Sequence, residues 1–270
     1  MIKLTKLHSF SEPFISAASG LVLARDHFYV IADDELFALK IDKNNFANTQ
    51  KITLFPGVLS EEKKLRKKTK PDLESIVELP SGDLLCIPSG SEEHRVLGAL
   101  IKNDGAAVIS FQTLYIKLRE IFTELNIEGA VVVGHSLRLF QRGNGEKHEN
   151  ATVDVNLVDF LQGLILITNI QRYSLGELNG AALSFTDATL YNDRIYFLAA
   201  AEASESTYLD GEFKGAVLGM MDLRGKILKQ EFLEVTSKPE GLSLDSGYFY
   251  IVTDDDDRSK PSTLLRGVLK

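Results

Sequence analysis

Five residues at a similar spacing carry side-chain oxygens at the start of short β-prone runs. They are separated by 55, 54, 58 and 54 positions and comprise Ser19, Glu74, Glu128, Thr186 and Glu240. If the five runs converge on one axis, three carboxylates and two hydroxyls meet there. Carboxylates at such range raise one another's pKa, so protons, a basic side chain or a bound cation must compensate them.

We expect a bound cation at this axis. No Lys or Arg occupies the equivalent position in any of the five runs, and oxygen ligands alone suit a hard cation such as Ca²⁺ better than zinc. Small residues follow four of the five positions and would let the runs approach closely. The alternative is a water-filled channel with partly protonated acids and no specific ion. Asp187, one residue off this register, is predicted to point to the other face and to act as an outer acceptor.

A second group of residues could carry out chemistry beside such an ion. Metal-assisted hydrolysis of a phosphoester requires a cation that polarises the phosphate, arginines that balance developing charge, and a carboxylate or histidine that positions water. His94, Arg95 and Arg142 are therefore the candidate catalytic residues. The alternative for each is an exposed ion pair at a blade edge, worth ~0–1 kcal/mol. The chain has no Gly-x-Ser-x-Gly, P-loop or His-Glu-x-x-His motif.

The elements that position these residues repeat with the same period. Each start opens a first strand, and a second strand-like run follows ten residues later, with Tyr29, Tyr196 and Tyr250 in three of the copies. A third run follows in every copy and a fourth in most, at 164–167 in the third copy. Four short strands separated by Gly, Asn, Asp and Ser turns are typical of one blade of a β-propeller. We therefore predict an all-β fold, a five-bladed β-propeller with four-stranded blades whose first strands line the channel.

The last copy has three strands before Lys270. Residues 2–8 lie before the first copy, and we expect them to supply the missing outer strand, which would remove an open sheet edge. The chain, 1–270, is then a single domain with repeats that start near residues 19, 74, 128, 186 and 240. Apolar residues at helical spacing predict a connecting helix over 114–125 on the outside. The basic run 61–70 is predicted to be a mobile loop, with the steering of an anionic ligand as the alternative.

Composition limits the classes of function. The chain has 270 residues, 44% of them hydrophobic and 25% charged, with a formal net charge of −8. These values are typical of a soluble globular protein and argue against nucleic acid or an anionic membrane as a partner. No run reaches the ~18 apolar residues of a membrane helix, and the first residues do not resemble a signal peptide, so we expect a cytoplasmic location. The single cysteine, Cys86, is expected to be free and buried.

The order Ser, Glu, Glu, hydroxyl-Asp, Glu over five repeats resembles that of the calcium-activated nucleotidases, or apyrases. The matching stretches are Ser19-Gly20-Leu21-Val22, Leu73-Glu74-Ser75, Ile127-Glu128-Gly129-Ala130, Phe185-Thr186-Asp187 and Pro239-Glu240-Gly241. The resemblance implies a five-bladed propeller whose axial Ca²⁺ is held by the five starting residues. The chain is also similar to the phytase-like esterase propellers and to bacterial relatives of no agreed activity. Thr186 stands where the nucleotidases have Ser, and Gly20 where they commonly have an acidic residue.

Three functions are consistent with these features. The first is a calcium-binding propeller that binds a small molecule or a protein on one face, and we favour it. The second, implied by the resemblance, is a Ca²⁺-dependent hydrolase of phosphoesters or nucleotides. The third is a lactonase or esterase that acts through the axial metal. The fold alone does not choose among them, because propellers support both binding and catalysis.

Overall fold

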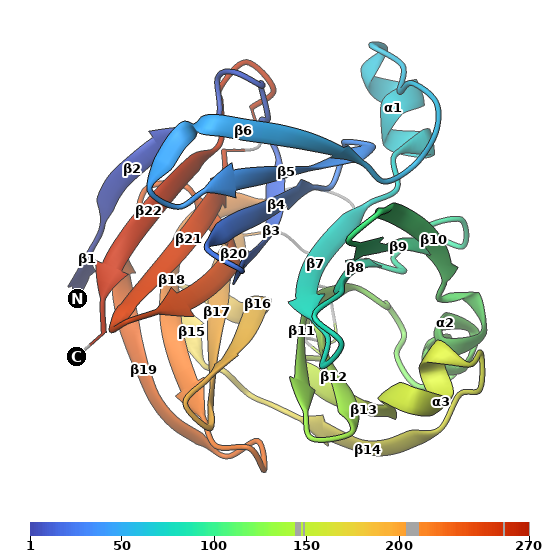
Figure 1. Cartoon of the computed structure of the whole chain (residues 1–270). Coiled ribbons are helices and arrows are strands. Elements are labelled where there is room, and N and C mark those ends of the chain that lie inside the picture. The colour runs from blue at the N-terminus through green and yellow to red at the C-terminus, as the bar shows by residue number, and fades with distance from the viewer. Residues whose placement is uncertain (144–146, 148, 204–210, 256, 270) are drawn as a thin grey trace.

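The structure of the protein is a computed structural model that describes residues 1–143, 147, 149–203, 211–255 and 257–269. It is a β-propeller of five four-stranded blades, as predicted (Figure 1). Within a blade the strands are antiparallel and follow one another outward in chain order, so the first strand of each blade lies at the axis. The five inner strands each contact the inner strands of both neighbouring blades and form a closed ring.

The first four blades take up consecutive segments of the chain. Blade one consists of β3 (Ala18–Ala24), β4 (His27–Ala32), β5 (Phe37–Asp42) and β6 (Asn45–Thr53). Blade two consists of β7 (Leu73–Glu78), β8 (Leu84–Pro88), β9 (Leu97–Lys102) and β10 (Gly105–Ser110). Blade three consists of β11 (Ile127–Val133), β12 (Ser136–Gln141), β13 (Ala151–Asn156) and β14 (Ile167–Arg172). Blade four consists of β16 (Ala181–Tyr191), β17 (Arg194–Ala203), β18 (Glu212–Met221) and β19 (Ile227–Glu234), with the short β15 (Glu177–Leu178) paired to β16.

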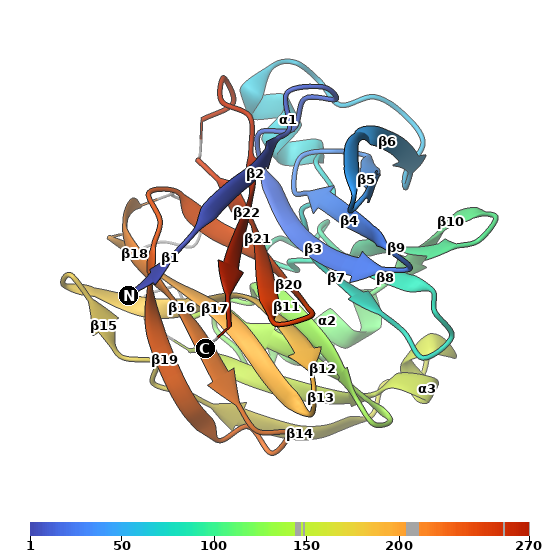
Figure 2. The ribbon, with the colours of Figure 1, turned by 60° about the vertical axis from the view of Figure 1, so that its left-hand side comes forward.

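The N-terminal segment closes the ring at blade five. This blade consists of β20 (Lys238–Asp245), β21 (Tyr248–Asp254) and β22 (Thr263–Val268), and its outer strand is β2 (Thr5–Ser9). The expectation that residues 2–8 complete this blade is wrong at its start, because β1 (Ile2–Lys3) pairs in parallel with β19 of blade four. The buried side chain of Ile2 belongs to the apolar cluster between blades four and five. The segment therefore joins two blades, and β1 lies beside β22 (Figure 2).

The outer strand of blade three lies later in the chain than predicted. The run 164–167 is a loop except for its last residue, which opens β14. Residues Leu157–Leu161 form the short helix α3 instead of leading directly into the strand. Asn156 caps this helix, since its side-chain oxygen accepts a hydrogen bond from the Asp159 N–H at 3.0 Å. The capped helix and the loop after it lie between β13 and β14, so the outer strand begins at residue 167.

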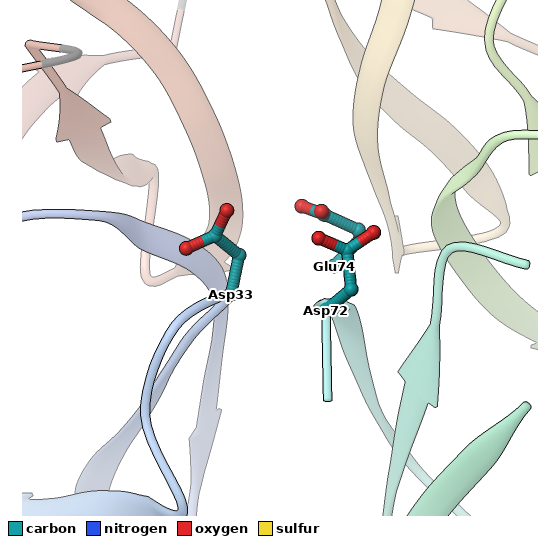
Figure 3. Close-up of side chains that lie close together, drawn as sticks. All are labelled: Asp33, Asp72 and Glu74. Carbon is teal, nitrogen blue, oxygen red and sulfur yellow. The ribbon is translucent and has the colours of Figure 1, made fainter. Parts of the chain in front are cut away.

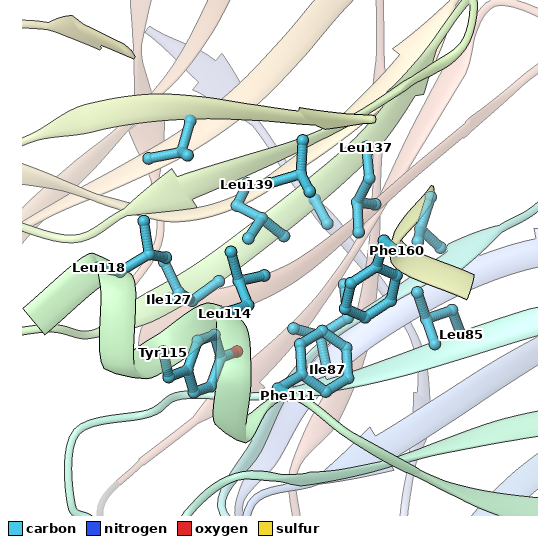
Figure 4. Packing of buried hydrophobic residues seen from close by; sticks show 14 of the residues in the cluster. Leu85, Ile87, Phe111, Leu114, Tyr115, Leu118, Ile127, Leu137, Leu139 and Phe160 are labelled. Carbon is cyan, nitrogen blue, oxygen red and sulfur yellow. The ribbon is translucent and has the colours of Figure 1, made fainter. Parts of the chain in front are cut away.

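A second helix covers the outer part of the contact between blades two and three. Helix α2 (Gln112–Arg119) lies where the sequence predicts a helix over 114–125. Leu114, Tyr115 and Leu118 are buried against residues of both blades (Figure 4). The helix ends before Phe122 and Leu125, yet both are buried in the same cluster. The apolar spacing therefore reflects burial of residues within the helix and also of residues after its end.

The basic run 61–70 is ordered around a helix, which corrects the predicted mobile loop. Helix α1 (Lys63–Thr69) stands beside blades one and two (Figure 1). The buried Arg66 holds it there, because the guanidinium lies 2.8 Å from both Asp34 Oδ2 and Glu35 Oε1 in the loop after β4. Two of the six basic residues of the run, Arg66 and Lys70, thus face the protein instead of solvent.

Cys86 lies in β8 and is fully buried, as expected, and burial raises the pKa of its thiol. It packs in the apolar cluster between blades one and two. Helices α1, α2 and α3, those of the described part of the chain, are each too short to cross a membrane.

Candidate functional site

The five predicted axial residues occupy the same structural position in every blade. Each is the extra residue of a β-bulge in its inner strand, where the pairing with the second strand shifts by one residue. A bulge turns the extra side chain away from the regular alternation of the strand. The bulges bring the five positions to one end of the channel, which we call the mouth: Ser19, Glu74, Glu128, Thr186 and Glu240. The equivalence predicted from their spacing is correct, whereas their roles as metal ligands stay a prediction.

Small residues after the bulges let the inner strands approach one another. A Cβ on Gly129 would lie 2.9 Å from the backbone N of Ala188 in blade four. A Cβ on Gly241 would lie 2.7 Å from the backbone N of Leu21 in blade one. These neighbours are main-chain atoms of the ring itself, so any larger residue would push two blades apart.

The two hydroxyl-bearing bulge residues join neighbouring blades. Ser19 Oγ donates a hydrogen bond of 2.5 Å to the carbonyl oxygen of Leu73, the residue before Glu74. Thr186 Oγ1 donates one of 2.7 Å to the carbonyl oxygen of Pro239, the residue before Glu240. Both hydroxyls are buried. Each therefore fixes the bulge of the next blade and keeps lone pairs that can accept a further bond.

Two of the three axial carboxylates are paired with basic side chains. Arg142 places Nη1 3.1 Å from Glu128 Oε1 and Nη2 2.6 Å from Glu202 Oε2. Lys238 Nζ lies 2.8 Å from Glu240 Oε1 and 3.3 Å from Glu202 Oε1. No base occupies the bulge position in any blade, but basic side chains from other positions reach the axial acids, so the expectation that the protein supplies no basic partner there is wrong. Arg142 follows the second strand of blade three, and Lys238 lies two residues before its own bulge.

A second chain of ion pairs lies at the same mouth, between blades one and two. The Lys70 ammonium contacts the Asp33 carboxylate and lies 2.8 Å from Asp72 Oδ1. The guanidinium of Arg95 lies 2.8 Å from Asp72 Oδ2, which also accepts a hydrogen bond from the Ser89 hydroxyl. Asp33 and Asp72 are further joined by a backbone hydrogen bond.

Glu74 stands between the two chains. One carboxylate oxygen each of Glu74, Asp33 and Asp72 lie within 4.8 Å of one another, and Figure 3 shows Asp33 facing the other two across a gap. Among the described residues, no basic side chain comes within 4.0 Å of the Glu74 carboxylate. Glu74 is thus the axial acid without a basic partner within 4.0 Å in the described part of the chain, and the Lys70 charge acts on it from further away.

The carboxylates of the mouth outnumber its cations. The two chains and Glu74 together contain six carboxylates and four basic groups, a formal charge of −2. Burial and the nearby Glu128 raise the pKa of Glu74 well above its ordinary value. Burial likewise raises the pKa of Asp33 to about 6 and that of Glu240 to about 8. Asp33 Oδ1 and Glu240 Oε2 are buried without a hydrogen-bond partner, so the mouth can take up protons or a cation.

Asp187 lies deeper in the ring than the bulge residues. It is buried, and its Oδ2 accepts a hydrogen bond of 2.7 Å from the Leu242 N–H of blade five. Its Oδ1 lies 3.5 Å from the Ser75 hydroxyl of blade two. Burial raises the pKa of Asp187 well above its ordinary value. Asp187 therefore links three blades, while its predicted role as an outer acceptor for a metal stays a prediction.

The three candidate catalytic residues do not come together. Arg95 and Arg142 are buried at the mouth, but each guanidinium is bound to carboxylates of a different ion-pair chain. His94 is exposed, because the turn after β8 points it outward while its neighbour Arg95 points in. The catalytic roles of His94, Arg95 and Arg142 stay a prediction.

Sequence reasoning missed three residues of the mouth. Asp72 and Lys238 lie two positions before a bulge residue, and strand alternation could have placed them on the same side. The third, Lys70, belongs to the basic run, and no pattern distinguishes it from its exposed neighbours. Asp33 and Glu202 lie near the ends of second strands, where the sequence offers them among several polar candidates without distinguishing them. The acidic run 254–257 includes residue 256, which lies outside the described residues.

The chain matches, over residues 14–269, the model of a family described as a family of unknown function, DUF6929. The protein belongs to this family. A comparison with curated protein sequences gives no match. The resemblance to the calcium-activated nucleotidases stays a prediction.

Solved structures share the fold of this family member. A glutaminyl cyclase from Myxococcus xanthus is 9% identical with a TM-score of 0.54, over 100% of this chain and 98% of the cyclase. A structure from work on the GH130 family of mannoside phosphorylases is 9% identical with a TM-score of 0.53, over 97% and 88%. A glycosyl hydrolase from Bacteroides ovatus is 8% identical with a TM-score of 0.52, over 93% and 84%. At such identity the likeness is one of fold.

Proposed function

We propose that the protein is a binding module. Asp33, Asp72 and Glu74 at its mouth bind a divalent cation, preferably Ca²⁺, and the same face binds a small-molecule ligand. The observation that carries the proposal is the Glu74 carboxylate, which lies among other acids without a basic partner within 4.0 Å in the described residues. An uncompensated carboxylate in such surroundings is costly unless a proton or a cation joins it.

The chemistry of the three ligands favours calcium over a transition metal. All three offer carboxylate oxygens, which a hard cation prefers. Ca²⁺ binds oxygens at about 2.4 Å, so two ligands on opposite sides of one ion lie about 4.8 Å apart. The oxygens of the triad lie within 4.8 Å of one another, a spacing that suits a single ion between them.

The proposed site shares only Glu74 with the axial set predicted from the sequence. An ion on the axis would compete with Arg142 for Glu128 and with Lys238 for Glu240. An ion at the triad would compete with Lys70 for Asp33 and Asp72, and Arg95 also contacts Asp72. The two placements make different predictions for substitutions at Glu74 and Glu128.

Calorimetric titration with Ca²⁺ tests the site. The parent chain should bind, Glu74→Gln should lose at least about tenfold in affinity, and Glu128→Gln should keep most of it, because Gln preserves shape and removes only charge. Bound Ca²⁺ should also raise the melting temperature, since an ion at 100 times its Kd stabilises the folded state by ~2.7 kcal/mol. An equal loss of Ca²⁺ affinity in both variants would indicate that the ion lies on the axis instead. If the parent chain shows no binding heat and no rise in melting temperature with Ca²⁺, the proposal is overturned.

The same samples decide between binding and hydrolysis. Arg95 and Arg142 are engaged by carboxylates and His94 is exposed, so these three candidates are not assembled into one catalytic group. Phosphate release from nucleoside diphosphates, and hydrolysis of lactones and aryl esters, should stay at background with Ca²⁺ and with chelator. Robust turnover that a chelator abolishes would show that the protein is an enzyme and not a binding module.

A further inference from the structure

The ammonium group of Lys70 occupies the place that a cation would take. It contacts the Asp33 carboxylate and lies 2.8 Å from Asp72 Oδ1, and these two acids form the proposed triad with Glu74. The Lys70 side chain is 13% exposed. The ammonium is thus a cation already held by two acids of the triad.

We infer that Lys70 is an internal competitor for the site: a divalent cation binds by displacing its ammonium from Asp33 and Asp72. This inference rests on the proposed cation site. The three carboxylates together with Arg95 have a formal charge of −2 once Lys70 has left, so a divalent ion neutralises them. An ion added beside Lys70 would leave a net positive charge in a partly enclosed site. Exchange is thus favoured over simple addition.

The surroundings of Lys70 allow such an exchange. Lys70 is the C-cap of α1, and only its flexible side chain enters the triad. Helix α1 keeps its anchor to blade one through Arg66 when that side chain leaves. Asp72 keeps Arg95 and the Ser89 hydroxyl on its other oxygen, Oδ2. The contacts that position Asp72 therefore do not depend on Lys70.

The first test compares Ca²⁺ affinity in the parent chain, Lys70→Met and Lys68→Met. Both substitutions remove one positive charge from the same basic segment, but Lys68 is exposed. Loss of the competing ammonium should tighten binding about tenfold or more in Lys70→Met, whereas Lys68→Met should stay within about twofold of the parent because solvent screens its charge. Equal affinities in Lys70→Met and the parent would overturn the inference.

The second test needs no substitution, so it holds even if Lys70→Met fails to fold. Amine acylation of the parent chain, read by mass spectrometry, should be slow at Lys70 with chelator and several-fold faster with Ca²⁺. Lys238, buried in the other ion-pair chain, should stay protected in both conditions. Ca²⁺ binding with Lys70 still protected would overturn the displacement and leave the proposed function standing. Absence of Ca²⁺ binding in both the parent and Lys70→Met would remove the proposed function itself.

Discussion

Replacing Arg142 by Met tests whether the ion pairs at the mouth form a buried network on which the fold depends. Arg142 lies 3.1 Å from Glu128 and 2.6 Å from Glu202, and the three side chains are only 7%, 4% and 8% exposed. Met keeps most of the apolar stem and removes the charge. The variant leaves two enclosed carboxylates without their guanidinium.

The expected cost follows from the contacts that remain. Breaking a buried pair by removing one partner costs ~3–5 kcal/mol. Glu202 keeps Lys238 at 3.3 Å, and Glu128 keeps a hydrogen bond of 2.7 Å from the Asn126 side-chain amide. These partners put the loss near the lower limit, about 3 kcal/mol. For a chain of this size, that corresponds to a fall of ~6–12 °C in the melting temperature.

Urea unfolding of Arg142→Met and of the double variant Arg142→Met/Glu128→Gln measures the effect. The double variant should recover part of the loss, because it no longer encloses the unpaired Glu128 charge. Although burial raises it, the charges of Arg142 and Lys238 lower the pKa of Glu202, so loss of Arg142 should cost less at pH 5, where the orphaned Glu202 takes up a proton, than at pH 8. A decrease in the free energy of unfolding of less than about 1 kcal/mol at pH 8 is what an exposed ion pair would give. This result would refute the view that the fold depends on a buried network at the mouth.

Glu240→Gln should flatten the pH dependence of stability. Burial raises the pKa of Glu240 from 4.5 to about 8. Its contribution to the free energy of unfolding is therefore complete below pH 4.5 and is lost as the pH rises toward 8. Identical slopes of the urea midpoint against pH in the variant and the parent would argue against this. Gly129→Ala puts a Cβ 2.9 Å from the backbone of Ala188 and should cost about 1–3 kcal/mol in thermal unfolding, an unchanged melting temperature being the contrary result. Thr186→Val removes the hydrogen bond to Pro239 and should cost about 1 kcal/mol, whereas Thr186→Ser should cost less, and equal costs would show that the hydroxyl is not responsible.

The architecture of this protein could be predicted from local and repeated features. Strands with turn residues between them recur at nearly constant spacing, and one repeat cannot bury its own apolar face, so five repeats close into a ring. The equivalence of Ser19, Glu74 and Glu128 followed from spacing alone, because the same bulge recurs at the same place in each inner strand. Pairing of β1 with blade four was not predictable, since two residues carry no periodicity.

The charge state of the mouth was decided by tertiary structure. The sequence by itself determined that acids gather at the axis, because position within a repeat translates directly into position around the ring. Which acids are compensated depends on side chains from other segments: Arg142 reaches Glu202, 60 positions away, and Lys70 reaches Asp33, 37 positions away. Coulombic attraction and desolvation act over a few ångströms in space without regard to sequence distance. For that reason only the folded chain distinguishes Glu74, which has no basic partner within 4.0 Å among the described residues, from Glu128 and Glu240, which have one.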